Sequence, residues 1–229
     1  MPELGNWLLW FAGLTTAYSL FILIIGIQRG RDGAALIASG YNAMLAAGAL
    51  LTLAAGLLFY NLATSNFRVE YVAHYTSREL PLFYKLSAFW GGQQGSLLLW
   101  AWLLALFTVA VLLIYQRKNL PTLPYVIAIL MAIILFFNTL LLLVAPPFEL
   151  LTRIPANGNG LNPLLQHPAM ALHPPLLYLG YVGMAVPLAF ALAALLSGHL
   201  DDSWVKNVRR WTLIPWFFLT MGIMLGAIL

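Results

Sequence analysis

The chain has 229 residues, of which 62% are hydrophobic and only 8% are charged. No soluble core of this size needs so much apolar surface, so the composition excludes an ordinary soluble domain and indicates a polytopic membrane protein. The net charge of +4 needs no nucleic-acid partner, because the basic residues lie in short loops where membrane topology explains them. Cysteine is absent, so a metal or cofactor would be held by His, Met or oxygen donors.

Six segments contain no Asp, Glu, Lys or Arg, and each is long enough to cross about 30 Å of hydrocarbon as a helix. These predicted spans are residues 4–27, 37–62, 96–115, 123–144, 176–196 and 211–229. The predicted fold class is therefore all-α, a helical bundle with a single transmembrane domain over residues 1–229. A cleaved signal peptide is not expected, because the start carries Glu3 instead of a basic region.

The distribution of Lys and Arg predicts the orientation of this bundle. The first, third and fifth loops hold seven of these residues, whereas the second and fourth hold four. By the positive-inside rule, the amino terminus is then extracytoplasmic. Residues 63–95 and 145–175, which form the second and fourth loops, lie on the same extracytoplasmic side.

The second loop is longer than a simple connection requires and is rich in aromatic residues. Residues 69–75 roughly alternate between apolar and polar, which predicts a short extended piece, and residues 80–90 are typical of a segment lying along the bilayer interface. His74 is interpreted as a solvated loop residue. Asn138, within the fourth span, is expected to face the bundle and to find a hydrogen-bond partner there, because an unpaired amide in lipid is costly.

The sequence WGGQQGSLLLW, residues 90–100, opens the third span. Its glycines, Gly91, Gly92 and Gly95, allow close approach of another surface, while Trp90 and Trp100 suit the headgroup region. One interpretation is a turn with aromatic anchors at the start of a helix. The other is a flat platform for a planar apolar ligand, and composition does not separate the two.

The fourth loop ends in two histidines, each followed by proline. Proline disfavours helical backbone at the preceding residue, and Pro175 suits a first helical turn, so His173 is predicted at the mouth of a helix. His167 and His173 would be about 240° apart on a helix, so they are not expected to work as a pair. A neutral imidazole there can ligate a metal, with haem iron a natural candidate. A helix start and Arg153 nearby in sequence also suit the carboxylates of a cofactor.

The fifth loop contains HisLeuAspAsp, residues 199–202, which is interpreted as a solvated inner loop because carboxylates and histidine are ordinary there. The sixth predicted span runs to Leu229 with no polar flank. A terminal carboxylate at the membrane boundary is expensive. We therefore expect a truncated chain or one piece of a split protein.

The motif of residues 90–100, followed by GLNPLLQHPAMALHPPLLYLGYVG at residues 160–183, closely resembles the haem lyase family CcmF of cytochrome c maturation, including its relative NrfE. The resemblance extends from PELG, residues 2–5, to GAIL, residues 226–229. It implies a membrane protein that receives haem from a periplasmic haem chaperone. Such a protein helps attach haem to apocytochrome c, working with thiol-handling proteins.

In that family the first external haem-ligand histidine corresponds to His173, whereas His167 corresponds to no known ligand. Trp90, Gly91, Gly92 and Gly95, with Pro174 and Pro175, are interpreted as support for the haem site. The family's tryptophan-rich external segment, its second external histidine and its paired transmembrane histidines are expected beyond Leu229. The resemblance thus implies half a site, in a bacterial inner membrane or, alternatively, a mitochondrial inner membrane.

A transporter or channel subunit without covalent chemistry is the alternative. Six spans, Asn138 and the proline-rich helix starts favour it. The absence of charged residues inside the predicted spans disfavours it, because ion and proton routes usually contain them.

Overall fold

The computed structural model describes residues 2–118, 120–200 and 202–227, and in that part the protein is mostly helical. The longer helices are α1 (Pro2–Gln28), α2 (Ala34–Ala63), α5 (Gln93–Tyr115), α6 (Leu123–Leu143), α7 (Pro168–Gly183), α8 (Ala185–Ser197) and α9 (Asp202–Gly226). The shorter elements are α3 (Glu70–Tyr75), α4 (Leu82–Ser87) and the 3-10 turns η1 (Gly30–Gly33), η2 (Ala88–Trp90), η3 (Gln116–Lys118) and η4 (Pro163–Leu165). The β-pairing in this part is one isolated bridge between Val69 and Leu150.

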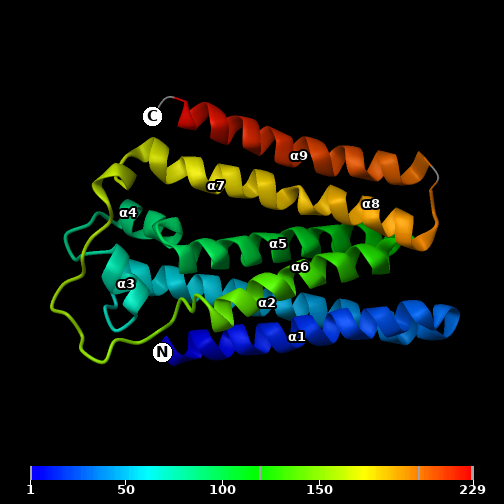
Figure 1. Ribbon diagram of the computed structural model, residues 1–229, viewed down its shortest axis with the longest axis horizontal. Helices are drawn as coiled ribbons and strands as arrows, with labels where there is room; N and C mark the ends of the chain where they lie inside the picture. The colour runs from blue at the N-terminus through cyan, green and yellow to red at the C-terminus, as the bar shows by residue number, and fades with distance from the viewer. Residues whose placement is uncertain (1, 119, 201, 228–229) are drawn as a thin grey trace.

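Within the described residues, five helical stretches are long and apolar enough to cross a membrane. They comprise residues 3–28, 30–63, 93–118, 123–143 and 168–197. The last helix, α9, lies along α7 and α8, so that α1 begins and α9 ends at the same end of the bundle (Figure 1). The predicted all-α polytopic membrane bundle is confirmed, although residues 228 and 229 of the sixth predicted span lie outside the described part.

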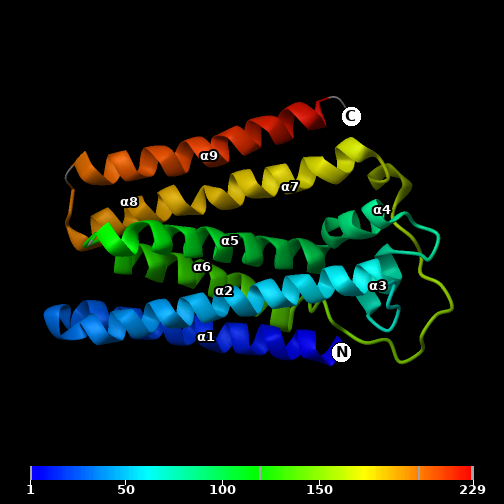
Figure 2. The same cartoon turned by 180° about the vertical axis from the view of Figure 1, so that it is seen from behind.

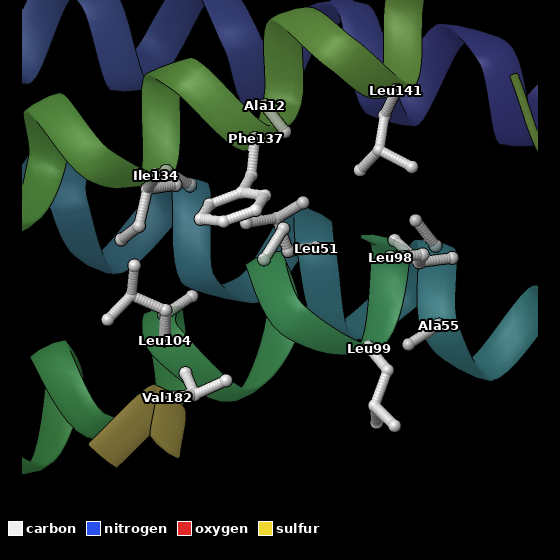
Figure 3. Close-up of a cluster of buried hydrophobic side chains, with 14 of the residues drawn as sticks. Ala12, Leu51, Ala55, Leu98, Leu99, Leu104, Ile134, Phe137, Leu141 and Val182 are labelled. Carbon is white, nitrogen blue, oxygen red and sulfur yellow. The ribbon is translucent and has the colours of Figure 1, made fainter. Parts of the chain in front are cut away.

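The helices form three layers (Figures 1 and 2). α1 and α2 pack on each other at one side, α5 and α6 lie in the middle, and α7 and α8 with α9 close the other side. Apolar side chains from all three layers fill the interior, and Figure 3 shows part of this core. The labelled members of this core are Ala12, Leu51, Ala55, Leu98, Leu99, Leu104, Ile134, Phe137, Leu141 and Val182. α3, α4 and residues 144–167 lie together at one end of the bundle, which is named here the loop end (Figure 2).

The prediction that His173 lies at the mouth of a helix is wrong. α7 begins at Pro168 and contains His173, Pro174 and Pro175, and the membrane-crossing stretch continues after Met184 as α8. Two prolines in a helix interior remove two backbone donors. Close packing of α7 on α9 offsets this cost, and proline at the first position suits the helix start at Pro168.

The predicted extended piece at residues 69–75 is also wrong, because α3 is a helix. Tyr71, Val72 and Ala73 are consecutive and all buried. In a half-exposed strand every second residue would face solvent, so three consecutive buried residues do not fit a strand. They fit a short helix that is covered on several sides. The following aromatic segment forms α4 and η2, in which Leu82 and Phe83 remain exposed.

Candidate functional site

His173 lies in the second turn of α7, where its partly buried imidazole meets α9. Nδ1 of His173 is 2.7 Å from the carbonyl oxygen of Gly222. A carbonyl can only accept a hydrogen bond, so Nδ1 carries the proton and donates it. In the neutral imidazole Nε2 then holds the lone pair, which makes it the ring atom able to ligate a metal.

The ring of His173 also packs directly on Gly226, one turn beyond Gly222 on α9. A Cβ at position 226 would lie 2.6 Å from Cε1 and 3.4 Å from Nε2 of the imidazole. A larger residue at this position would have to displace the ring. Gly226 therefore sets the distance at which the imidazole lies from the backbone of α9.

Close packing of α7 on α9 continues along both helices. At each level one helix supplies glycine and the other a larger side chain, with Gly183 facing Pro215, Gly180 facing Leu219, Gly222 facing Leu177 and Gly226 facing His173. Small residues at membrane helix interfaces let the backbones approach closely. The position of His173 is therefore the last level of a continuous interface.

The other histidines make local contacts. Nδ1 of His167 caps α7 by accepting a hydrogen bond from Ala169 at 3.3 Å, and Nδ1 of His199 lies 3.1 Å from the Ser197 carbonyl oxygen. His74 is half exposed and lies 4.0 Å from Glu70. In the described part no three His, Asp or Glu side chains gather as a metal site, and His173 is the histidine whose hydrogen bond joins two long helices, α7 and α9.

The glycine motif of residues 90–100 holds α3 against the start of α5. The Tyr71 hydroxyl accepts a hydrogen bond from the Gly92 amide at 3.1 Å and lies 2.9 Å from the carbonyl oxygens of both Ala88 and Phe89. A Cβ at position 95 would overlap that hydroxyl, and one at position 92 would overlap the Tyr75 ring. Burial raises the pKa of Tyr71, so the hydroxyl stays neutral and available as a donor.

The two sequence motifs lie at the same end of the bundle. Gly91 lies against Leu161 in the segment 144–167 of the loop end, with 3.1 Å between an ideal Cβ and the leucine Cδ1, and Trp90 is the last residue of η2 directly before Gly91. Among the described residues, no hydrogen bond or ring contact joins Trp90 or these glycines to His173. Pro174 and Pro175 follow His173 within α7 and are partly buried.

Trp100 is partly buried and packs toward the neighbouring helices of the bundle. It stacks on Phe137 of α6 with centroids 4.5 Å apart and contacts Tyr181 of α7 at 4.9 Å. Because α5 begins at Gln93, Trp100 stands about 10 Å along the helix from its start. This aromatic cluster ties the middle layer to the helix that carries His173.

The sequence interpretation missed Gly222 and Gly226 as partners of the candidate ligand. Their spacing of four residues is the small-residue pattern of close membrane-helix contacts. That pattern predicts a tight interface on α9, but it does not reveal which residue of another helix faces it.

These features define a helical integral membrane protein whose histidine is fixed between two helices and, among the described residues, makes a hydrogen bond through Nδ1 alone. The family profile described as Cytochrome C assembly protein matches residues 90–229. Since that match covers more than half of the chain, the protein belongs to the cytochrome c assembly protein family, as the sequence motifs predicted.

Individual relatives extend the match over nearly the whole chain. The cytochrome c-type biogenesis protein CcmF of Haemophilus influenzae is 40% identical, and that of Escherichia coli is 42% identical, each over 99% of this chain and 35% of the relative. NrfE of Haemophilus influenzae is 38% identical with the same coverage. A solved structure, the cytochrome c heme lyase CcmF, has a TM-score of 0.80 and 31% identity over 96% of this chain and 34% of that one. The chain thus spans about a third of its relatives' length.

Proposed function

We propose that the protein binds haem in cytochrome c maturation and that His173 supplies an axial ligand through Nε2. The observation that carries this proposal is the hydrogen bond from Nδ1 to the Gly222 carbonyl oxygen. A hydrogen bond on one ring nitrogen fixes the tautomer and raises the basicity of the other nitrogen toward iron. The haem would supply the porphyrin iron and the vinyl groups to which cysteine thiols add to form thioethers, while this chain binds and orients it.

The environment of His173 fits such a group. The imidazole is only partly buried, and Gly226 leaves the α9 side of the ring without a side chain. In the described part, His74, His167 and His199 all make contacts elsewhere. We therefore propose that the second axial ligand comes from the part of the relatives that this chain does not span.

The relatives' names point to the wider reaction. One solved relative is named a heme lyase, and the sequence relatives are named cytochrome c-type biogenesis proteins. We propose that the chain receives haem from a periplasmic haem chaperone. It would then support haem attachment to apocytochrome c together with thiol-handling proteins and the remaining lyase portion.

The proposed setting is a bacterial inner membrane with the loop end outside the cytoplasm. Bacterial relatives and the distribution of basic residues support it. In this orientation, His173, Trp90 and the glycines of residues 91–95 would all face the compartment in which cytochromes c mature. The proposed role of Trp90, Gly91, Gly92 and Gly95 is to shape the rim of the haem site, with Pro174 and Pro175 keeping the helix beside His173 rigid.

Haem spectra of the protein, expressed together with the portion it lacks relative to its homologues, test this function. His173→Ala should lower retained haem by at least about tenfold, since an axial bond is lost. His167→Ala is the matched control, because it removes an imidazole from the same helix start. Unchanged haem content and an unchanged axial-ligand spectrum in His173→Ala would refute the ligand assignment.

A further inference from the structure

Two adjoining hollows lie where α2 ends, at the loop end. The first, of about 570 Å³, is lined by Tyr60, Thr64, Ser65, Asn66, Phe67, Arg68, Arg78, Ile154 and Pro155. The second, of about 420 Å³, is lined by Ala63, Thr64, Ser65, Arg78 and Lys85. Together they are named here the Arg78 hollow. Three cations and no carboxylate line it, so it attracts anions.

No ion pair in the described part neutralises these cations. Within the described residues, none of Arg68, Arg78 and Lys85 lies within ion-pair distance of a carboxylate. Glu79 follows Arg78 directly, but its Oε2 accepts a hydrogen bond from Asn157 at 2.9 Å, and this bond is the main reason why its pKa is lowered.

Arg78 is held in place from several directions. Its amide donates to Asn157 Oδ1 at 2.9 Å, and its carbonyl oxygen accepts from Lys85 Nζ at 3.2 Å. The guanidinium carbon lies 6.0 Å from the centroid of the Phe67 ring, within cation–π range. Because the Arg78 side chain is already held in place, binding a ligand would cost less conformational entropy.

Ser65 provides a second, independent observation. It follows the end of α2 with φ of 51°, the one positive φ on a non-glycine residue in the described part. The amide of Asn66 donates to the Asn61 carbonyl and that of Ser65 to the Leu62 carbonyl. This is the helix-ending Schellman pattern, in which the left-handed position normally holds glycine.

Serine at that position is strained, yet its hydroxyl does nothing for the fold. The Ser65 Oγ is screened from solvent and has no hydrogen-bond partner in the part of the chain that the structure describes, although the residue lines both hollows. Backbone strain that persists without a structural gain marks a functional position. The unused hydroxyl would donate to a ligand oxygen once the side chain turns toward the hollow.

We propose that the Arg78 hollow binds the phosphate of an anionic phospholipid. Arginine and lysine, with a hydroxyl donor, are the groups that recognise phosphate oxygens. The hollow lies at the end of a membrane helix, and Tyr60 and Ile154 on its edge are 57% and 56% exposed. Those side chains would contact the glycerol and upper acyl carbons, which a free phosphate lacks.

To test this, the purified chain in detergent is titrated with phosphatidylglycerol, phosphatidylcholine or sodium phosphate. Native mass spectrometry measures the bound lipid, and thermal unfolding measures the stability. Phosphatidylglycerol should bind and stabilise, whereas phosphatidylcholine and sodium phosphate should have little effect. Arg78→Gln should weaken phosphatidylglycerol binding about tenfold. Arg117→Gln removes a cation at the opposite end of the bundle and should leave binding unchanged.

Ser65→Gly separates the binding role from a structural one. Glycine relieves the positive φ, so the unfolding midpoint without lipid should rise while phosphatidylglycerol binding weakens. Parental affinity in both Ser65→Gly and Arg78→Gln would overturn the site. Equal binding of phosphatidylcholine would overturn the preference for an anionic headgroup, and full protection by sodium phosphate alone would overturn the lipid as ligand.

Discussion

At the scale of single residues, α9 positions the candidate ligand without contributing a side chain of its own to the contact. The Gly222 carbonyl orients the imidazole of His173, and Gly226 leaves room for the ring. The backbone makes both contributions, so a substitution that keeps a small polar side chain at position 222 or 226 would not preserve the fit of the imidazole. Only the smallest residue keeps the distance between ring and helix.

Gly226→Ala should therefore disturb His173 while leaving the bundle folded. The added methyl group would have to push the ring away from α9 and weaken its bond to Gly222, so haem affinity should fall about tenfold. Haem titration followed by the Soret absorbance measures this change. Gly56→Ala is the control, since a Cβ at position 56 meets no atom within 4 Å. Equal affinity in the two variants would show that α9 does not position the ring.

For Asn138 the sequence correctly predicted burial inside the bundle, but the predicted hydrogen-bond partner is wrong. It is fully buried, as expected, but neither side-chain atom makes a hydrogen bond in the described part. Gly13 approaches it closely, with 3.0 Å between an ideal Cβ and Oδ1. The neighbouring backbone fills the space that a donor side chain would need.

Asn138→Leu should leave the thermal unfolding midpoint in detergent unchanged or raise it, because removing an unpaired buried amide costs little or gains about 1 kcal/mol. Asn61→Leu is the counterpart. Asn61 donates to Leu57 at 2.7 Å and accepts from Asn66 at 2.8 Å, so its loss should destabilise by about 1–3 kcal/mol. Equal destabilisation by both variants would mean that Asn138 has a partner such as bound water.

At the scale of elements, the glycine motif forms a close-packed surface, named here the socket, on which the tyrosines of α3 pack. Tyr71 reaches across to the turn before α5, and Gly92 and Gly95 leave space for Tyr75 and Tyr71. Sequence alone offered a turn or a ligand platform for these glycines. The contacts establish close packing as one of their roles, while support of a haem site stays a prediction.

Tyr71→Phe should destabilise the protein by about 1–3 kcal/mol, because it leaves the partly buried Gly92 amide without its acceptor. Hydrogen exchange at the Gly92 amide should accelerate in parallel. Tyr60→Phe removes an exposed hydroxyl at the end of α2 and should change neither quantity. Slow exchange at Gly92 in Tyr71→Phe would contradict the socket interpretation.

At the scale of the whole molecule, the sequence predicted the helices well and their partners poorly. Long charge-free segments identify spans because hydrocarbon admits few other structures. The start of α7 was misplaced by eight residues, since local proline rules do not include the packing of Gly180 and Gly183 on α9. The sequence motifs identified His173 as the candidate ligand. Its hydrogen-bond partner Gly222 is 49 residues away in the sequence, and the periodicity of a sequence predicts local elements but not contacts between distant residues.

The distribution of charge predicts the orientation in the membrane, and this prediction can be tested on the chain directly, because it contains no cysteine. Thr152, in the segment 144–167 of the loop end, and Gln116, which directly follows the end of α5, are both exposed. In intact bacteria, a membrane-impermeant maleimide should label Thr152→Cys and spare Gln116→Cys until the membrane is opened. Both variants should label equally in detergent, which controls for accessibility. The reverse pattern would place His173 and the Arg78 hollow on the cytoplasmic side, which would rule out haem delivery by a periplasmic chaperone at this site.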